Sequence, residues 1–306
     1  RHYIKSHRSA NVKTISLTTS ARLVMSSGVV CMSQGLLSQS ACVYPSNQIT
    51  LVRPVGGGST CMRCFQGEVD GELVFVKGIF DKTMFQRELQ ILQHLGGHPN
   101  IVKMKAIGEE DGEAKLLILE LMESNLAEFI VSPEYEQLSI QRRVEIALNI
   151  ANALQCVHEK SLIYRDIKLE NVLVSKQGRE VKLADFGLSC VLAKNQYLRD
   201  RQQPKGNALY MAPEVMKLAP FDEKADIFGF GILLWEILTG TRWYPPAAYC
   251  TAKSYFSFIC ENGARPIIPD DIANALKILI QRCWHDDAEK RPSATEIISA
   301  LENIVD

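Results

Sequence analysis

Apolar and polar positions alternate in short runs along the first half of the patterned chain. From Ile49 onward, β-branched and other apolar residues predict strands over 49–55, 73–79, 101–108 and 115–121. One amphipathic helix is expected between the second and third of these strands. Asp81 suits its N-cap, and one face carries the apolar residues Phe85, Leu89 and Leu92. This half is therefore predicted to be β-rich with a single long helix.

After Ser124 the apolar spacing becomes that of helices. Residues 228–238 are apolar nearly all round, which predicts a buried helix. Ser293 and Glu296 have the spacing of a capping box, so the last helix is expected to begin there. Another helix is predicted over 138–160, where apolar residues recur at helical spacing: Ile140, Val144, Ala147, Ala151, Leu154 and Val157.

A small β-rich part followed by a larger helical part, with no internal repeat, predicts two lobes with a cleft between them. The first 48 residues lack such periodicity. Residues 1–67 contain seven Lys or Arg and no Asp or Glu, and residues 1–48 are rich in serine. We predict that 1–48 is a basic, acid-free and mostly disordered segment.

The nature of this leading segment has several interpretations. Because the chain starts at Arg1 rather than Met, we interpret the chain as a fragment or a processed product. A basic, acid-free N-terminus also fits an organelle transit peptide. A linker or a non-native leader is the alternative.

Composition and charge exclude some classes of partner. The chain is 46% apolar and 23% charged, and 34 basic against 35 acidic residues give a net charge of −1, so we expect no nucleic acid partner. No apolar run approaches the roughly 20 residues of a membrane span. Nine cysteines are scattered, and the CxxC pair Cys61 and Cys64 has no second pair that would complete a zinc site. Reduced thiols and a cytoplasmic location are therefore expected.

The stretch YRDIKLENVLV, residues 164–174, places strongly polar side chains between apolar flanks. Leu162 and Ile163 precede it, and its last three residues are apolar, so both flanks are expected to be buried strands. Each unpaired buried charge costs several kcal/mol, so a core would exclude this loop. A loop that holds a charged substrate and a metal ion requires such side chains.

With its neighbours, this loop resembles the catalytic loop of eukaryotic protein kinases. Asp166, Lys168 and Asn171 match the pattern (H/Y)-R-D-x-K-x-x-N. Further kinase elements follow or precede in the same order as in that family: Lys77 after a strand, Glu88 on the next helix, Asp185-Phe186-Gly187, Ala212-Pro213-Glu214, Asp226 and Arg291.

The resemblance covers residues 49–304 and implies an α+β, bilobal protein kinase fold. A small β-rich N-lobe would span 49–120, a hinge 120–124, and a larger helical C-lobe 125–304. The details of the catalytic loop and the C-terminal segments resemble serine/threonine kinases of the tyrosine-kinase-like branch.

The resemblance also assigns roles to the catalytic loop. Asp166 would accept the proton of the substrate hydroxyl, and Lys168 would neutralise charge near the transferred phosphoryl group. Asn171 and Asp185 would supply oxygen ligands for Mg²⁺. The implied partners are ATP and a protein substrate, and a regulatory protein that orders the loop between Gly187 and Ala212 is a further expectation.

For ATP itself, Lys77 is expected to contact the phosphates while it pairs with Glu88. The remaining residues expected to bind ATP are matched by position in the family pattern: Val55, Gly56, Gly57, Gly58, Cys64, Phe75, Glu120, Met122 and Leu173.

Other matched residues are expected to be structural. Arg165 would either bind a loop phosphate or brace the loop, and Asp226 would receive backbone N–H groups of the catalytic loop. Glu214 and Arg291 would form a buried ion pair. An apolar spine would join the lobes through Leu92, Met104, Tyr164 and Phe186.

Two departures from the pattern concern the nucleotide. The glycine-rich loop contains Gly56, Gly57 and Gly58, but another residue stands at the position of the last glycine in the pattern G-x-G-x-x-G. This departure weakens the expected phosphate cradle. Phe75 stands where V-A-I-K has alanine, so its ring either fills part of the adenine slot or packs aside in the lobe.

Two functions are therefore compatible with the sequence. The first is a serine/threonine protein kinase that uses Mg-ATP, because the set Lys77, Glu88, Asp166, Asn171 and Asp185 is complete. The second is a pseudokinase that serves as a scaffold or binding module with weak or no ATP binding.

Overall fold

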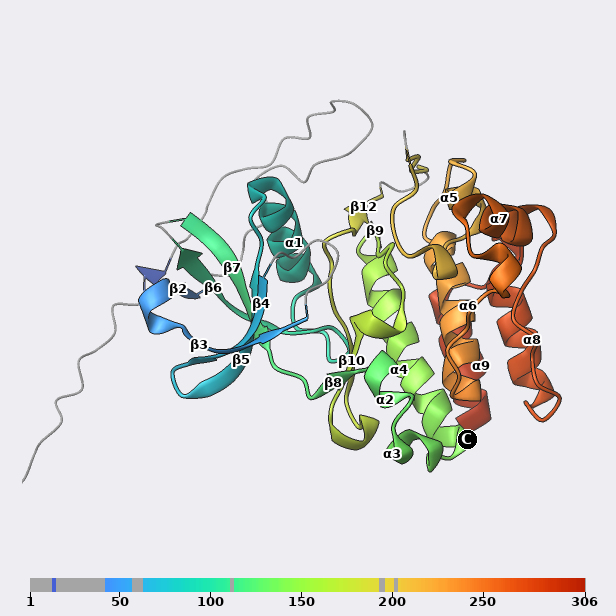
Figure 1. Ribbon diagram of the computed structural model, residues 1–306, viewed down its shortest axis with the longest axis horizontal. Coiled ribbons are helices and arrows are strands. Elements are labelled where there is room, and N and C mark those ends of the chain that lie inside the picture. Colours follow the sequence, from blue (N-terminus) through green and yellow to red (C-terminus); the bar gives the residue numbers. More distant parts are fainter. Residues whose placement is uncertain are drawn as a thin grey trace, which may run out of the picture.

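The chain folds into a β-rich lobe and a larger helical lobe that lie side by side (Figure 1). The computed structural model describes residues 13–14, 42–56, 63–110, 113–192, 196–200 and 203–305. In this described part, the N-lobe combines a twisted sheet with a long α-helix, and the chain then crosses to the C-lobe near Glu120. This arrangement confirms the α+β, bilobal fold expected from the pattern.

The described strands of the N-lobe form one sheet of seven strands in the order β1-β2-β6-β7-β5-β4-β3. Neighbouring strands are antiparallel, except that β2 runs parallel to β6. Their bounds are β1 Lys13–Thr14, β2 Cys42–Pro45, β3 Thr50–Val55, β4 Arg63–Val69, β5 Glu72–Gly78, β6 Met104–Glu110 and β7 Glu113–Glu120.

Successive side chains of β5 point to opposite faces of the sheet, and the two faces differ in their contacts. Val74 and Val76 are buried in a small core on the outer face. Phe75 packs against the main core of the molecule, on the face that also carries Lys77. Strand β5 therefore directs Phe75 and Lys77 toward the same side of the sheet.

Helix α1 (Lys82–Leu95) crosses the sheet on that side (Figure 1). The Asp81 side chain caps it by accepting a hydrogen bond from Met84 N at 2.8 Å, as expected. Its apolar face buries Phe85 and Leu92. The same helix therefore fixes the position of Glu88, which is also buried.

Two features of the N-lobe were not expected from the sequence pattern. Strand β4 was not predicted, because the sequence RCFQGEV mixes polar residues and glycine with few apolar ones. The fold also begins earlier than residue 49, because β2 and a short 3₁₀ helix, Ser46–Gln48, precede β3. Strand β2 is held in the sheet by its parallel pairing with β6. Apart from 13–14 and 42–48, the segment 1–48 lies outside the described residues.

The C-lobe is built around helices α4 (Ile140–Glu159) and α6 (Lys224–Thr239), which pack together (Figure 1). Helix α6 is buried from Asp226 to Leu238, as its continuous apolar sequence predicts. The other helices are α2 Leu126–Phe129, α3 Pro133–Glu136, α5 Pro213–Met216, α7 Ala252–Phe256, α8 Asn274–Cys283 and α9 Ala294–Val305.

The last helix begins at the expected capping box. Glu296 N donates to Ser293 Oγ at 3.2 Å, and Ser293 N donates to Glu296 Oε2 at 2.8 Å. Short strands complete the lobe: β8 Ser124–Asn125, β9 Leu162–Ile163, β10 Val172–Val174, β11 Val181–Leu183 and β12 Cys190–Val191.

Candidate active site

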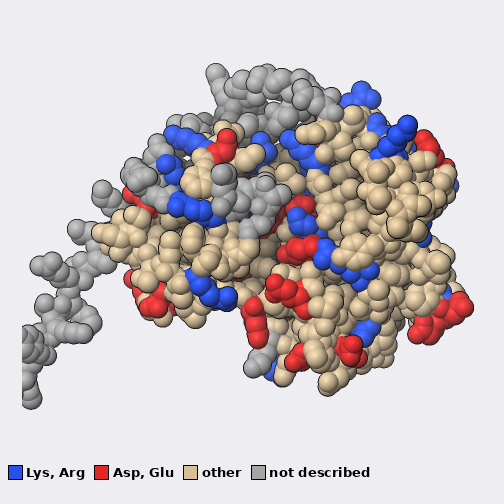
Figure 2. Space-filling view, in the orientation of Figure 1, with Lys and Arg blue, Asp and Glu red and all other residues tan. Residues whose placement is uncertain are grey.

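Acidic and basic side chains gather where the two lobes meet (Figure 2). The catalytic loop lies there, between β9 and β10, and both flanking strands are buried as predicted. Asp226, at the start of α6, holds the loop by its backbone. Its carboxylate accepts hydrogen bonds from Tyr164 N and Arg165 N, both at 2.8 Å, which confirms the structural role expected for Asp226.

Two residues of the site adopt the left-handed backbone conformation, which is uncommon for residues other than glycine. Arg165 has a φ of 72° and Asp185 a φ of 57°. Such conformations persist where surrounding contacts impose them, and they concentrate at functional sites. Here they turn the chain just before Asp166 and at the aspartate of D-F-G.

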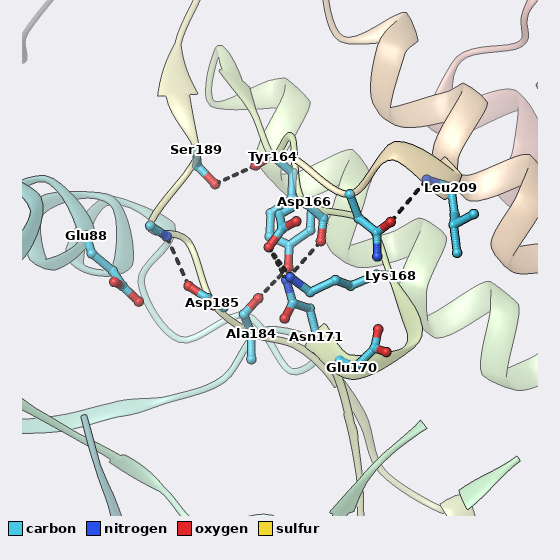
Figure 3. A network of polar contacts seen from close by, with 12 residues as sticks. Glu88, Tyr164, Asp166, Lys168, Glu170, Asn171, Ala184, Asp185, Ser189 and Leu209 are labelled. Atoms are coloured by element: carbon cyan, nitrogen blue, oxygen red, sulfur yellow. Dashed lines mark hydrogen bonds and ion pairs between the residues drawn. The ribbon is translucent and has the colours of Figure 1, made fainter. Parts of the chain in front are cut away.

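Asp166, Lys168 and Asn171 form a compact polar group (Figure 3). Asp166 Oδ2 lies 2.5 Å from Lys168 Nζ and accepts a hydrogen bond from Asn171 Nδ2 at 2.8 Å. Asn171 Nδ2 also donates to the Asp166 carbonyl at 2.9 Å. Asp166 is therefore held as an oriented carboxylate, as a base that receives a hydroxyl proton must be.

Lys77 bridges the two lobes. Its ammonium lies 2.6 Å from Glu88 Oε1 on α1 and 2.9 Å from Asp185 Oδ1 in the C-lobe. Burial lowers the pKa of Lys77, but the two carboxylates outweigh burial and the pKa is raised. Burial raises the pKa of Asp185, but Lys77 outweighs it and the pKa lies below its ordinary value. Lys77 is therefore a cation and Asp185 an anion near neutral pH.

The donor set at Asn171 and Asp185 fits a magnesium ion. Both hydrogen bonds described for the Asn171 side chain use Nδ2, which leaves its carbonyl oxygen as a ligand. In the described part of the chain, the hydrogen bonds and the ion pair of the Asp185 carboxylate all use Oδ1, which leaves Oδ2. Mg²⁺ prefers such hard oxygen donors.

The residues expected to bind ATP come from both lobes. Val55 of β3 lies opposite Cys64 of β4, so these two strands bring them together. Gly56 follows, and an added Cβ there would meet nothing within 4 Å. Gly57 and Gly58 lie outside the described residues. The expectation for the phosphate cradle stays a prediction.

The other side of the expected nucleotide site is the link between the lobes. Glu120 ends β7, Met122 lies half-buried two residues later, and Leu173 is half-buried in β10. The side chain of Glu120 is not free, because both of its oxygens lie 2.8 Å from Lys182 Nζ. A contact between Glu120 and a nucleotide stays a prediction.

Phe75 lies opposite Leu119 of β7 and Gln66 of β4. It is half-buried, and its position on the face that carries Lys77 places it on the side where a nucleotide would lie. The hypothesis that its ring fills part of the adenine slot is therefore compatible with the fold.

The structural assignments agree with the contacts. Arg291 Nη1 and Nη2 lie 2.6 and 2.8 Å from the two oxygens of Glu214, and the Arg291 side chain is fully buried. Tyr164 and Phe186 meet edge to face with ring centroids 5.3 Å apart. Leu92 belongs to the same core as these two rings, and Met104 packs against that core, which is compatible with the expected spine.

Some residues of the site were not predicted. Lys182 was missed as the partner of Glu120, His158 as a partner of Asp226 at 2.9 Å, and Asp200 as the partner of Arg165. Each is a common residue type outside any motif, so only the fold brings it to the site.

Comparison with known proteins agrees with this geometry. Residues 65–301 match the family described as protein tyrosine and serine/threonine kinase. The chain belongs to the protein kinase family. The kinase domain is 34% identical to the dual specificity protein kinase shkE of Dictyostelium discoideum over 257 residues, which are 81% of this chain and 36% of that protein.

This chain is also similar to a plant kinase, at nearly the same sequence identity. The serine/threonine/tyrosine-protein kinase HT1 of Arabidopsis thaliana is 33% identical over 221 residues, 72% of this chain and 55% of that protein. This kinase chain thus spans about a third to a half of the relatives' length. Among the described residues, no helix has both the length and the apolar character needed to cross a membrane.

Proposed function

We propose that this domain transfers the γ-phosphoryl group of ATP to serine or threonine hydroxyls of protein substrates. The observation that supports it best is the contact of Lys77 with both Glu88 and Asp185, because phosphoryl transfer requires this lysine, its helix partner and the D-F-G aspartate to meet. Asp166 would accept the proton of the attacking hydroxyl, and Lys168 beside it would offset the charge of the phosphoryl group.

Mg²⁺, held by Asn171 and Asp185, would neutralise phosphate charge during transfer. Lys168, two residues after the catalytic aspartate, supports serine/threonine specificity. The similar kinase shkE is named a dual specificity protein kinase, so the test must also detect phosphorylation of tyrosine. Among the residues that the structure describes, no disulfide joins two cysteines, and we propose a cytoplasmic location with reduced thiols.

The test uses the whole purified chain with Mg-ATP and a generic basic protein as acceptor, followed by phosphoamino acid analysis. We expect phosphoserine or phosphothreonine, and an Asp166→Asn variant as control should give neither. Phosphotyrosine alone would contradict the proposed specificity.

The second candidate is a pseudokinase that acts as a binding module. It is favoured by Phe75 on the nucleotide side of the sheet and by the incomplete glycine pattern. A thermal-unfolding titration with ATP, with and without Mg²⁺, separates the two candidates, since a ligand of the folded state raises Tm. No shift at millimolar ATP would favour the pseudokinase.

A further inference from the structure

The described part of segment 188–211, between the D-F-G and A-P-E motifs, folds over the guanidinium group of Arg165. Arg165 Nη2 lies 2.7 and 2.6 Å from the two carboxylate oxygens of Asp200. Each of these side chains is only 10% exposed. The guanidinium also lies over the ring of Phe221, 5.3 Å from its centroid. Asp200 is therefore the anion that balances a largely buried cation of the catalytic loop.

Backbone contacts hold the same segment against the C-lobe. Leu198 and Phe221 exchange two backbone hydrogen bonds of 2.8 and 2.9 Å, and Lys205 N donates to Asp200 Oδ2 at 3.3 Å. Gly206 has a φ of 112°, and a Cβ there would lie 2.7 Å from the Arg165 carbonyl oxygen. The segment thus touches both the side chain and the backbone of Arg165.

The segment offers almost no hydroxyl that could carry a phosphate. Its hydroxyl residues are Ser189, Tyr197 and Tyr210. Ser189 is fully buried and donates to the Tyr164 carbonyl at 3.0 Å. Tyr210 is buried and donates to Glu236 at 2.8 Å. Tyr197 is 61% exposed, and the position that a loop phosphate takes beside an arginine is already filled by Asp200.

We propose that Asp200 is a positioning residue for phosphoryl transfer, whose carboxylate replaces a phosphate at Arg165 and holds the catalytic loop without modification. This inference rests on the proposed function. Arg165 directly precedes Asp166, and Asp226 holds its backbone N at 2.8 Å in the left-handed conformation. Asp200 fixes the other end of Arg165, so its loss leaves a buried cation unpaired next to the catalytic base.

The experiment compares the whole chain with Asp200→Asn, Asp200→Glu and Arg165→Gln, with the double variant Arg165→Gln/Asp200→Asn, and with the exposed control Asp270→Asn. Thermal unfolding verifies that each variant is folded. We expect Asp200→Asn to lower kcat about tenfold or more while the KM for ATP changes little, because the residue acts on the loop and not on the nucleotide. Asp200→Glu, which keeps the charge, should recover much of the loss, and Asp270→Asn should match the wild type.

The double variant tests whether Asp200 acts through Arg165. It should lose no more activity than Arg165→Gln alone, because the two residues form one interaction. Phosphatase treatment of the wild type should leave its activity unchanged. Wild-type kcat in Asp200→Asn, losses that add in the double variant, or silencing by phosphatase would each overturn the inference.

Hydrogen exchange over residues 196–210 gives a readout that does not depend on activity. We expect faster exchange in Asp200→Asn than in the wild type, because the segment loses its anchor. If the wild type transfers no phosphate, the proposed function fails while this measurement still decides the role of Asp200. Equal exchange in the two proteins would refute that role.

Discussion

The ammonium nitrogen of Lys77 lies 2.6 Å from Oε1 of Glu88, and the two side chains are only 5% and 2% exposed. A charge pair this deeply buried is costly to break, because each partner would remain in a medium that solvates it poorly. The pair also joins the sheet to α1, so it couples the position of the helix to that of Lys77.

Glu88→Gln should therefore lower both stability and activity. We expect a loss of about 1–3 kcal/mol in the free energy of unfolding, because Lys77 loses a charged partner but keeps Asp185, and a higher KM for ATP. Chemical denaturation and steady-state kinetics measure the two effects. Glu72→Gln is the matched control, since Glu72 forms its ion pair with Lys105 at the surface and should matter little. Equal effects of the two substitutions would contradict this account.

Asp166→Asn and Asp185→Asn should separate chemistry from metal binding. If the proposed roles hold, both should reduce kcat by about a thousandfold or more, because each substitution would remove a group that acts on the reacting atoms. Asp166→Asn should keep the rise in Tm caused by Mg-ATP, whereas Asp185→Asn should lose the part that depends on Mg²⁺. Retained activity in either variant, measured with a generic basic acceptor, would exclude the role assigned to that residue.

Phe75→Ala tests whether the ring occupies part of the adenine slot. If it does, the variant should bind ATP more tightly, and a recovery of ~1.4 kcal/mol corresponds to a tenfold lower Kd. Isothermal titration measures the affinity. Val76→Ala is the control, because Val76 is buried on the opposite face of the same strand and its truncation should destabilise the lobe without changing nucleotide affinity. Unchanged or weaker binding by Phe75→Ala rules out the slot-filling hypothesis.

Glu236 gives the stability a pH dependence. This buried residue of α6 accepts hydrogen bonds from Tyr210 Oη at 2.8 Å and Trp243 N at 2.9 Å. Burial raises its pKa from 4.5 to about 7. The folded protein therefore keeps a proton that the unfolded chain releases above pH 4.5, so its stability falls as pH rises from about 4.5 to 7 and then levels off.

The Glu236→Gln variant has no carboxyl group at this position, so its stability should not fall in this way as pH rises. Its stability relative to the wild type should improve with pH between 5 and 7.5, by on the order of 2 kcal/mol, and stay constant above that. Urea denaturation at several pH values measures the difference. A difference that does not vary from pH 5 to 8 would show that Glu236 ionises normally in the folded protein.

Sequence patterns were sufficient for the parts of the fold that depend on local periodicity. The cap at Asp81, the capping box at Ser293 and the buried helix after Asp226 are confirmed, because each arises from neighbouring residues. Strand β4 was missed because its stability comes from pairing on both sides with β3 and β5 rather than from its own composition. The strand expected from residue 101 begins at Met104, because Ile101 instead bridges to Leu183 of the C-lobe.

The site residues likewise divide into those that a local motif indicates and those that only distant contacts bring to the site. Asp166 and Asn171 could be proposed because they match a family motif within one loop, and the structure places Asn171 Nδ2 2.8 Å from Asp166 Oδ2. Asp200 could not, because its partner Arg165 is 35 residues away and the charged run around it has the appearance of a solvated loop. Its importance depends on burial, which is a property of the folded chain.

Strand β2 has a practical consequence for any shortened form of the protein. It covers the outer edge of β6 over three residue pairs, from Val43 with Ile107 to Pro45 with Glu109. Removing everything before Ile49, the boundary that the sequence pattern suggests, would expose the backbone N–H and C=O groups of that edge. Unpaired strand edges act as templates for other chains. A kinase domain trimmed in this way would be expected to self-associate, so recombinant boundaries belong upstream of Cys42.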